Sequence, residues 1–326
     1  MTKTSNLNSR RGTERGRPEP QTFRVAIARF APVYLDKAAS LARAIQIVQD
    51  AKKRGAELVA FGETWLPGYP AWLDVCPNVA LWEHIPTKQV FARLRQNSVT
   101  IPGPEIAALC EAAGDLKINV VMGVNERVEA GPGNGTLYNS VLPITSEAKL
   151  ANHHRKLVPT HAERLVWGNG DGRGLSSVET KNRRIGGLIC WEHWMPLARM
   201  AMHNSGEHLH IAVWPTVHEL HQLCSRHYAF EGRCFVLAVG LMMPTRDLPS
   251  ELQDDTNMQK GRDWLERGGS AIIAPDTRYI VEPIYDREEL IVIDLNLSEI
   301  DQELLTLDVS GHYSRPDVFT FHTKTQ

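Results

Sequence analysis

The stretch Arg184-Ile-Gly-Gly-Leu-Ile-Cys190 is followed directly by Trp191-Glu-His-Trp-Met-Pro196-Leu-Ala-Arg199. The first part is a short apolar run, which indicates a buried strand, and Pro196 suits the first turn of a helix. The pattern therefore predicts a strand, a turn and a helix, with the Cys190 thiol at the strand end. A thiol at such a turn can lie in a cleft, near backbone N–H groups that favour a thiolate. Read alone, Cys190 is more simply a core residue, since free cysteines are among the most buried residues.

A carboxylate occupies a similar position earlier in the chain. Glu63 ends the apolar run Glu57-Leu-Val-Ala-Phe-Gly-Glu63 and leads into Thr64-Trp-Leu-Pro-Gly-Tyr-Pro70. The flanking aromatic residues would partly desolvate the carboxylate and raise its pKa, which suits a general base near neutral pH. Read alone, Glu63 is an ordinary solvated glutamate in a loop.

A lysine ends a third segment, Asn152-His-His-Arg-Lys156. The alternating stretch 150–156 predicts a strand, and Pro159 marks the loop after it. An ammonium held beside a carboxylate can stabilise negative charge that develops on a substrate atom. Read alone, Lys156 is a solvated residue in a basic patch with Arg155.

Together these segments resemble the nitrilase branch of the carbon–nitrogen hydrolase superfamily, which carries Glu, Lys and Cys in this order, each at a strand end. The resemblance covers roughly residues 23–319. It departs from the family at Gly62, because the family motif usually reads Phe-Pro-Glu and this chain has glycine in place of the proline. The matching motifs are Phe61-Gly62-Glu63, the stretch 155–168 around Lys156 and Glu163, the stretch 190–199, and Gly311-His-Tyr-Ser-Arg-Pro-Asp-Val-Phe319.

The resemblance implies an α/β fold with mixed sheets, arranged as a four-layer αββα sandwich. It also implies a nitrilase, which converts a small-molecule nitrile to a carboxylic acid and ammonia through a cysteine thioimidate and thioester. Cys190 would be the nucleophile, Glu63 the general base and Lys156 the stabiliser of developing charge. Glu163 matches the family's second glutamate and would orient Lys156 or a water. The mechanism needs no metal or organic cofactor.

Other functions stay open at this point. An amidase of the same superfamily would use the same triad on a carbonyl, although the motif after Glu163 and the C-terminal motif favour nitrilases. A cyanide-degrading enzyme is a narrower variant. A non-catalytic oligomeric scaffold is the alternative outside enzymes.

Several aromatic residues near these motifs are candidates for a substrate pocket, and each can equally be a core residue. They are Trp65, Tyr69, Trp167, Trp191 and Trp214.

Composition limits the partners that this chain of 326 residues can have. The formal net charge of −2 gives no basic field for nucleic acid, and no apolar stretch is long enough to cross a membrane. An odd number of cysteines, five, does not suggest a disulfide framework, so we expect a cytoplasmic protein. The resemblance further implies a homo-oligomer built from dimers, which in the family can extend into a spiral.

The chain divides into two parts. Residues 1–22 combine four arginines with Gly, Ser and Pro and almost no hydrophobic residues, which predicts a disordered basic tail. Residues 23–320 form the expected carbon–nitrogen hydrolase domain. Two motifs within it are discounted: His218-Glu-Leu-His221 is one residue short of a zinc-protease motif, and the glycine-rich stretch 168–174 lacks the Lys-Ser/Thr of a phosphate loop.

Periodicity and turn residues predict the remaining elements. Helices are expected from Asp36 to Arg54, from Pro104 to Leu116, and through Cys224 to Gly232. A charged insertion with partial helix is expected at 245–267. Strands are expected at 23–30, 58–61, 118–124, 136–144, 150–156, 210–214, 235–243, 271–274, 279–283 and 290–295.

Overall fold

The computed structural model describes residues 22–181, 183–258 and 261–324. The predicted tail, residues 1–22, lies outside this part of the chain except for Thr22, the first residue of β1. Among the described residues, no helix is both long enough and apolar enough to cross a membrane.

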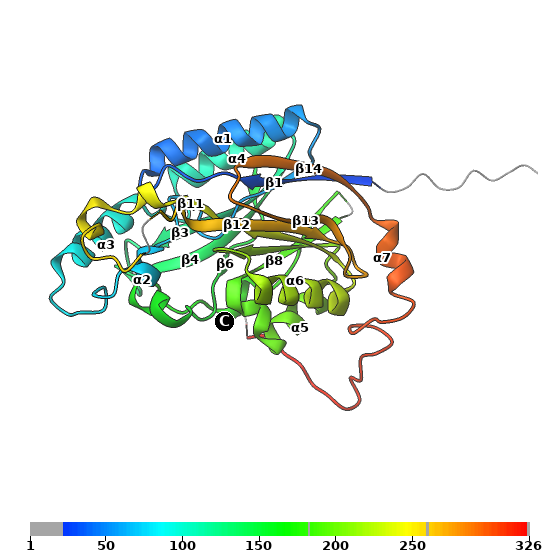
Figure 1. The fold of residues 1–326 in the computed structure, drawn as a ribbon. Coiled ribbons are helices and arrows are strands. Elements are labelled where there is room, and N and C mark those ends of the chain that lie inside the picture. The colour runs from blue at the N-terminus through cyan, green and yellow to red at the C-terminus, as the bar shows by residue number, and fades with distance from the viewer. Residues whose placement is uncertain (1–21, 182, 259–260, 325–326) are drawn as a thin grey trace, which may run out of the picture.

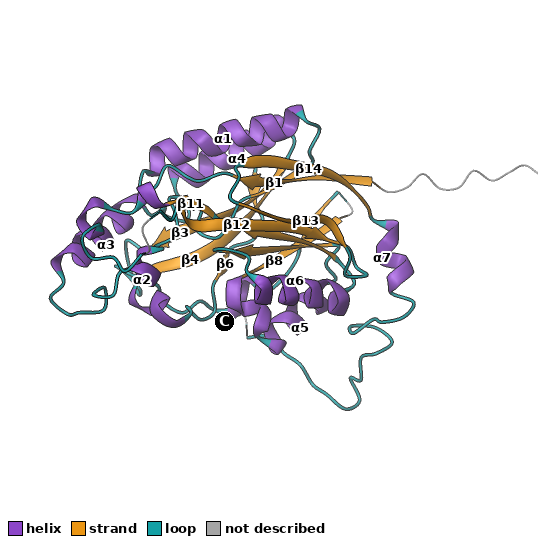
Figure 2. Cartoon of the chain, viewed as in Figure 1, coloured by secondary structure: helices purple, strands orange, loops and turns teal. Residues whose placement is uncertain are grey.

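Two mixed sheets form the centre of the fold (Figures 1 and 2). The first has the strand order β14-β1-β2-β3-β4-β5, with β6 also paired to β4. Its strands are β1 (Thr22–Arg29), β2 (Leu58–Ala60), β3 (Asn119–Arg127), β4 (Leu137–Thr145), β5 (Lys149–Leu150), β6 (His154–Arg155) and β14 (Glu289–Asn296). The second has the order β11-β12-β10-β9-β8-β7, with β13 paired to β12. Its strands are β7 (Val178–Thr180), β8 (Arg183–Ile189), β9 (Leu209–Trp214), β10 (Phe235–Gly240), β11 (Met242–Pro244), β12 (Trp264–Ile273) and β13 (Tyr279–Tyr285).

Helices cover the outer face of each sheet, and this confirms the four-layer αββα sandwich. Helices α1 (Lys37–Lys53) and α4 (Pro104–Leu116) lie on the first sheet, and α5 (Pro196–Asn204) and α6 (Glu219–Gly232) on the second (Figure 1). The peripheral helices are α2 (Trp72–Val75), α3 (Ile85–Asn97) and α7 (Ser298–Glu303).

The alternation of side chains in β1 explains this layering. Ala26 and Ala28 belong to the apolar cluster under α1, where small side chains let the helix pack closely. Val25 and Ile27 point the other way, into the cluster between the sheets. The predicted cap is also present, because the Asp36 carboxylate accepts a hydrogen bond from Ala39 N at 2.9 Å.

Three predicted elements differ from the structure. The strand at 150–156 is interrupted, because the chain pairs with β4 only at β5 and β6. The strand at 235–243 is divided at Leu241, whose N–H is shared between the carbonyl of Trp214, the last residue of β9, and that of Pro215. The insertion at 245–267 ends earlier than predicted, since β12 begins at Trp264 and pairs with β11 and β10. The sequence reading also missed α3, a helix with only Val90 and Leu94 buried.

Candidate active site

The end of β2 positions Glu63. The next residue, Thr64, has a φ of 45°, so the chain turns sharply after the carboxylate. Gly123 on β3 permits this turn, because a Cβ there would collide with the Gly62 carbonyl. Glu63 is completely buried.

The segment after β6 positions Lys156. Its backbone N–H bonds the Asn139 carbonyl on β4 at 2.8 Å, and its own carbonyl accepts from Gly170 N at 2.8 Å. These bonds direct a side chain that is only 1% exposed into the protein interior. The lysine therefore lies at a strand end, as the sequence indicated, although the strand is only two residues long.

Glu163 is held by a short 3₁₀ helix, His161–Leu165. Its Oε2 accepts a hydrogen bond from Thr160 N at 2.6 Å, as in a capping box. Its Oε1 accepts from the Tyr69 hydroxyl at 2.9 Å. Both contacts fix the carboxylate before any substrate binds.

Cys190 follows β8 directly and has a φ of 53°, a left-handed conformation that is uncommon outside glycine. A 3₁₀ helix, Cys190–Trp194, and then α5 with Pro196 at its start complete the predicted strand–turn–helix. Glu192 stabilises the turn from within. Its carboxylate accepts hydrogen bonds from Ile189 N and from Leu157 N, each at 2.7 Å. Because Ile189 precedes Cys190 and Leu157 follows Lys156, Glu192 links the two segments that carry these residues.

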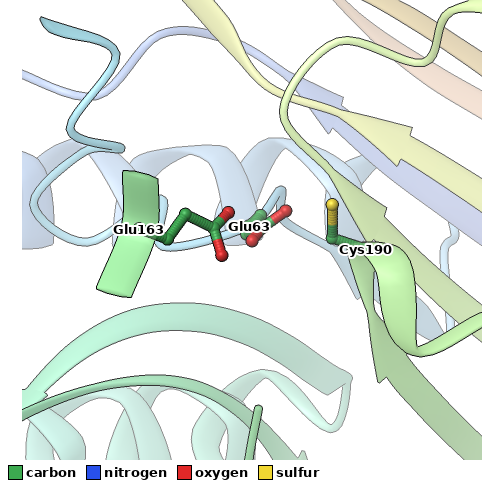
Figure 3. A group of neighbouring side chains, drawn as sticks. All are labelled: Glu63, Glu163 and Cys190. Carbon is green, nitrogen blue, oxygen red and sulfur yellow. The ribbon is translucent and has the colours of Figure 1, made fainter. Parts of the chain in front are cut away.

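The four candidate catalytic residues converge in the structure. Lys156 Nζ lies 3.0 Å from Glu63 Oε1 and 2.7 Å from Glu163 Oε2. The Cys190 sulfur and an oxygen of each carboxylate lie within 4.8 Å of one another, and Figure 3 shows these three side chains side by side. Asn139 Nδ2 also donates to Glu63 Oε1, at 2.7 Å. Glu63 Oε2 is buried and has no hydrogen-bond partner among the described residues, so it is free to accept a proton.

Electrostatics divide the roles within this cluster. Burial raises the pKa of Glu63 to about 7, and this direction confirms the expectation from the sequence. Burial alone would lower the pKa of Lys156, but Cys190, Glu63 and Glu163 outweigh it, so the ammonium keeps its proton. A carboxylate that titrates near neutrality beside a permanent cation can exchange protons while the cation stabilises charge.

The state of Cys190 differs from the simplest sequence expectation. Burial raises the pKa of the thiol well above its usual range, and the neighbouring Glu63 raises it further, against the effect of Lys156. The turn therefore does not hold a ready thiolate. A base must remove the proton as the sulfur attacks, and the nearest candidates are the carboxylates of Glu63 and Glu163, each with an oxygen within 4.8 Å of the sulfur.

Two carboxylates and a thiol also resemble a metal site. Here, however, the Lys156 ammonium bonds both carboxylates at 2.7–3.0 Å. A divalent cation at the same oxygens would be repelled by this charge. The donor set therefore does not fit a metal ion.

A cavity of about 200 Å³ opens onto the cluster. Glu163 and Cys190 lie in its wall, and Tyr69 and Trp191 of the predicted pocket residues line it as well. The rest of the lining is largely polar. These residues are Asp74, Thr160, His161, Ala162, Pro215, Thr216, His218, His221 and Glu266.

The other three predicted pocket residues do not line this cavity. Trp65 is buried in the first apolar cluster and donates from Nε1 to the Phe30 carbonyl at 2.6 Å. Trp167 supports the pocket indirectly, because its ring packs on Tyr69 with centroids 5.7 Å apart. Trp214 is covered by two histidine rings, at centroid distances of 4.7 and 4.4 Å. These three tryptophans pack behind the site and support it, but they do not line the cavity.

Sequence reasoning missed several residues at the site. Asn139 and Glu192 carried a signal, since a polar residue inside an otherwise apolar run needs a partner when buried. His218 and His221 were considered only as metal ligands, whereas they line the cavity at the start of α6. Burial lowers the pKa of both, which keeps them neutral at pH 7.

A chain of buried side chains leads away from the nucleophile. His193 Nδ1 lies 2.6 Å from the Cys190 carbonyl, and its Nε2 lies 2.9 Å from His210 Nε2. His210 Nδ1 contacts Glu207 Oε1 at 2.9 Å, and the Tyr228 hydroxyl donates to Glu207 Oε2 at 2.6 Å. The carbonyl of Cys190 is thus held by a network of buried side chains.

A buried thiol, an ammonium and two carboxylates in an αββα sandwich define the class of thiol hydrolases. The sequence model of the carbon-nitrogen hydrolase family matches residues 24–302 of this chain. The chain is 40% identical to a nitrilase of an unknown prokaryotic organism, covering 91% of each chain. It is 37% identical to an aliphatic nitrilase of Sinorhizobium fredii, covering 91% of this chain and 94% of the relative. The chain belongs to the carbon–nitrogen hydrolase family and, within it, to the nitrilase branch.

Further relatives agree with this assignment. A bifunctional nitrilase/nitrile hydratase of Lupinus angustifolius is 34% identical, covering 93% of this chain and 86% of the relative. A solved structure from Saccharomyces cerevisiae, a member of branch 10 of the nitrilase superfamily, superposes with a TM-score of 0.69. It shares 20% sequence identity and covers 90% of this chain and 97% of its own, so it supports the fold.

Proposed function

We propose that this protein is a nitrilase that hydrolyses an organic nitrile to the carboxylic acid and ammonia. The observation that carries the proposal is the cluster in which a Glu63 oxygen lies within 4.8 Å of the Cys190 sulfur, while Lys156 holds Oε1 and Oε2 has no partner among the described residues. The cluster supplies a base, a nucleophile and a fixed cation, and Cys190 and Glu163 connect it to the cavity. Relatives named nitrilases support the substrate class.

In the first stage, Glu63 Oε2 takes the thiol proton as the Cys190 sulfur attacks the nitrile carbon. The carbon–nitrogen triple bond loses one bond, and the nitrogen receives the proton, which gives a thioimidate. Lys156 stabilises the negative charge that develops on nitrogen. The cluster is complete without an added cation.

In the second stage, a water molecule gives a proton to Glu63 and adds to the thioimidate carbon. Glu63 passes this proton to the nitrogen, and the proton of the new hydroxyl group follows it, so that the tetrahedral species loses ammonia and leaves a thioester. Another water molecule then releases the carboxylic acid and restores the thiol. Overall, one nitrile and two water molecules give one acid and one ammonia.

The test is a panel of aliphatic, aromatic and arylaceto nitriles, with cyanide and the corresponding amides included as substrates, in which acid, amide and ammonia are all measured. Ammonia and acid in equal amounts from at least one organic nitrile support the proposal. Turnover of amides alone would identify an amidase, and turnover of cyanide alone a cyanide-degrading enzyme. No turnover of any substrate would favour a non-catalytic scaffold.

We also propose that the protein is a cytoplasmic homo-oligomer with a dimer as its building block. Large apolar side chains on α5 and α6 support assembly, because Leu197, Leu220 and Leu223 are 70%, 64% and 56% exposed. The two helices are joined by Arg199 and Glu231, whose Nε and Oε2 lie 2.6 Å apart. Light scattering of Leu223→Glu beside the wild type tests this, since a charge at a subunit interface should reduce the assembled mass.

A further inference from the structure

Glu266 on β12 shares the cavity with Cys190, yet the proposed chemistry does not use it. Its side chain is buried, with the residue only 7% exposed. Buried carboxyl groups are rare without a partner or a function. The hydrogen bonds around it show which of its oxygens is available.

The hydroxyl of Thr216 determines the role of one carboxyl oxygen. Thr216 Oγ1 accepts a hydrogen bond from Arg267 N at 2.9 Å and lies 2.6 Å from Glu266 Oε2. The hydroxyl donates its one hydrogen to Oε2, which acts as an acceptor. Within residues 22–181, 183–258 and 261–324, the hydrogen bond from Thr216 to Oε2 is the one that the Glu266 carboxyl group makes, and Oε1 has none.

The surroundings decide the charge of this carboxyl group. Burial raises the pKa of Glu266 to about 8, and the nearby Asp74 and Glu63 act in the same direction. Arg262 opposes them, but its guanidinium donates to the carbonyls of Trp264 and Leu265. At pH 7 the group is mainly a neutral acid.

The other titratable groups at the cavity do not reverse this. Burial lowers the pKa of His218 and His221, so neither supplies a positive charge to ionise Glu266 at pH 7. Desolvation of its carboxyl group raises the pKa of Asp74 at the same cavity, and Glu163 raises it further. With Oε2 occupied as an acceptor, the proton of the neutral acid is placed on Oε1, as a free donor.

We propose that Glu266 is a specificity-determining residue that donates a hydrogen bond from Oε1 to an acceptor atom of the nitrile, such as an ether oxygen, a carbonyl oxygen or a pyridine nitrogen. This rests on the proposed nitrilase function. A purely hydrocarbon substrate leaves a buried donor unsatisfied, which weakens its binding. A nitrile with a carboxylate group meets the acidic side chains of Asp74 and Glu163 and is disfavoured.

The test compares matched substrates that differ in one acceptor atom. Suitable pairs are methoxyacetonitrile with butyronitrile, and nicotinonitrile with benzonitrile. The measured quantity is the ratio of kcat/KM within each pair. Because the acceptor atom also activates the nitrile carbon, the ratio is compared between enzymes and between pH values.

Glu266→Leu should lower the ratio about tenfold or more at pH 7 for the pair that the cavity accommodates, since it removes the donor. Glu266→Gln should keep most of the preference, because its amide N–H can still donate. Glu282→Leu is the matched control on β13, where the glutamate is exposed, and should leave the ratio unchanged.

The pH dependence gives a readout that needs no variant. In the wild type the preference for the acceptor should decline as the pH rises through about 8, because ionised Glu266 can no longer donate. In Glu266→Gln it should stay constant over the same range. A pH-independent ratio in the wild type would overturn the inference, even if Glu266→Leu failed to fold.

The two proposals fail in different ways. Hydrolysis of both members of every pair, with equal ratios in the wild type and Glu266→Leu, would overturn the role of Glu266 and leave the nitrilase function standing. Absence of ammonia from every nitrile would overturn the nitrilase function itself.

Discussion

Asn139 donates a hydrogen bond from Nδ2 to Oε1 of Glu63 at 2.7 Å. The same oxygen accepts from the Lys156 ammonium at 3.0 Å. The two donors together saturate one side of the carboxylate. The other oxygen, Oε2, has no hydrogen-bond partner among the described residues, so the proposed mechanism assigns it the role of the base.

Asn139→Leu should move the acid limb of the pH profile to higher pH. The base is active when deprotonated, so kcat/KM should rise as the pH increases through the pKa of Glu63, about 7. The hydrogen bond from Asn139 lowers that pKa, and its loss should raise it. At pH 7 the rate should fall by roughly tenfold or more.

A pH series of kcat/KM for the wild type and Asn139→Leu measures this shift. Ser140→Ala is the matched control, because its hydroxyl bonds Glu126 and not Glu63. If the acid limb of the kcat/KM profile stayed at the same pH and only its maximum fell, Asn139 would act only through folding.

Cys190→Ala should abolish turnover while the protein stays folded, because the thiol begins the covalent route. Cys190→Ser should be nearly as inactive, since a hydroxyl is far harder to deprotonate. Single-turnover assays with mass spectrometry of the acylated wild type provide the measurement. A residual rate above about a thousandth of the wild type would require another nucleophile.

The strongest sequence expectations were those supported by a local pattern. The helix over Pro104–Leu116 is confirmed to the residue, and Asp36 caps α1 as its position indicated. Each of Glu63, Lys156 and Cys190 follows a strand, but their grouping was expected only from the resemblance to the nitrilase branch. In the layered fold these strand ends meet around one cluster.

The rest depended on contacts between distant segments. Trp65 and Tyr69 lie four residues apart, yet only Tyr69 reaches the cavity, where it bonds Glu163. Glu266 belonged to a segment predicted to be a charged insertion, but pairing with Met243 places it in β12. Strand register is a tertiary property, and periodicity in a single segment cannot supply it.

His193 should be needed to hold the nucleophile, because its ring bonds the Cys190 carbonyl. If His193 Nδ1–H donates to that carbonyl, its Nε2 must accept from His210, and His210 Nδ1 must then accept from Glu207. Burial raises the pKa of Glu207 to about 7, consistent with a protonated carboxyl group there. Glu207→Gln, which can make the same donation, should therefore retain most activity.

His193→Leu should lower kcat by about tenfold or more and slow the alkylation of Cys190 by iodoacetamide, since the thiol loses its fixed position. His193→Asn should restore part of both, because its amide can donate to the same carbonyl. Equal alkylation rates in the wild type and His193→Leu would show that the histidine does not position the thiol.

Glu126 should make the fold sensitive to acid. Burial alone would raise its pKa, but hydrogen bonds from His153, Arg155 and Ser140 outweigh it and lower the pKa to about 2. A carboxyl group with a lowered folded pKa stabilises the fold above its unfolded pKa, near 4.5, and this stabilisation is lost as the pH falls towards 2. The difference corresponds to about 3 kcal/mol at most.

Glu126→Gln should therefore lower the Tm at pH 7, and the deficit should shrink as the pH is reduced from about 5 to 3. Thermal unfolding followed by circular dichroism at both pH values gives the measurement. Glu129→Gln is the control, because its pair with Arg127 is largely exposed, with the Glu129 side chain at 56%. A Tm deficit that does not change with pH would show that the lost packing, and not the charge, matters.

Glu163 should influence which product leaves the enzyme. The tetrahedral species can expel ammonia, which leads to acid, or the Cys190 sulfur, which releases amide. Ammonia leaves only when the nitrogen carries positive charge, and the carboxylates of Glu63 and Glu163 favour that charge beside Lys156. One relative of this chain, from Lupinus angustifolius, is named a bifunctional nitrilase/nitrile hydratase.

Glu163→Gln removes one negative charge while keeping the shape of the side chain. In this variant only Glu63 neutralises the positive charge of Lys156. The ammonium therefore repels a positive charge on the substrate nitrogen more strongly, and a protonated amine becomes less favourable. We expect a slower enzyme with a larger amide fraction, measured by chromatography of acid and amide from one nitrile. Tyr69→Phe is the matched control, since it removes one hydrogen bond to Glu163 without changing the charge. An unchanged ratio in Glu163→Gln would remove Glu163 from the product step, and amide as the main wild-type product would overturn the assignment as an acid-forming nitrilase.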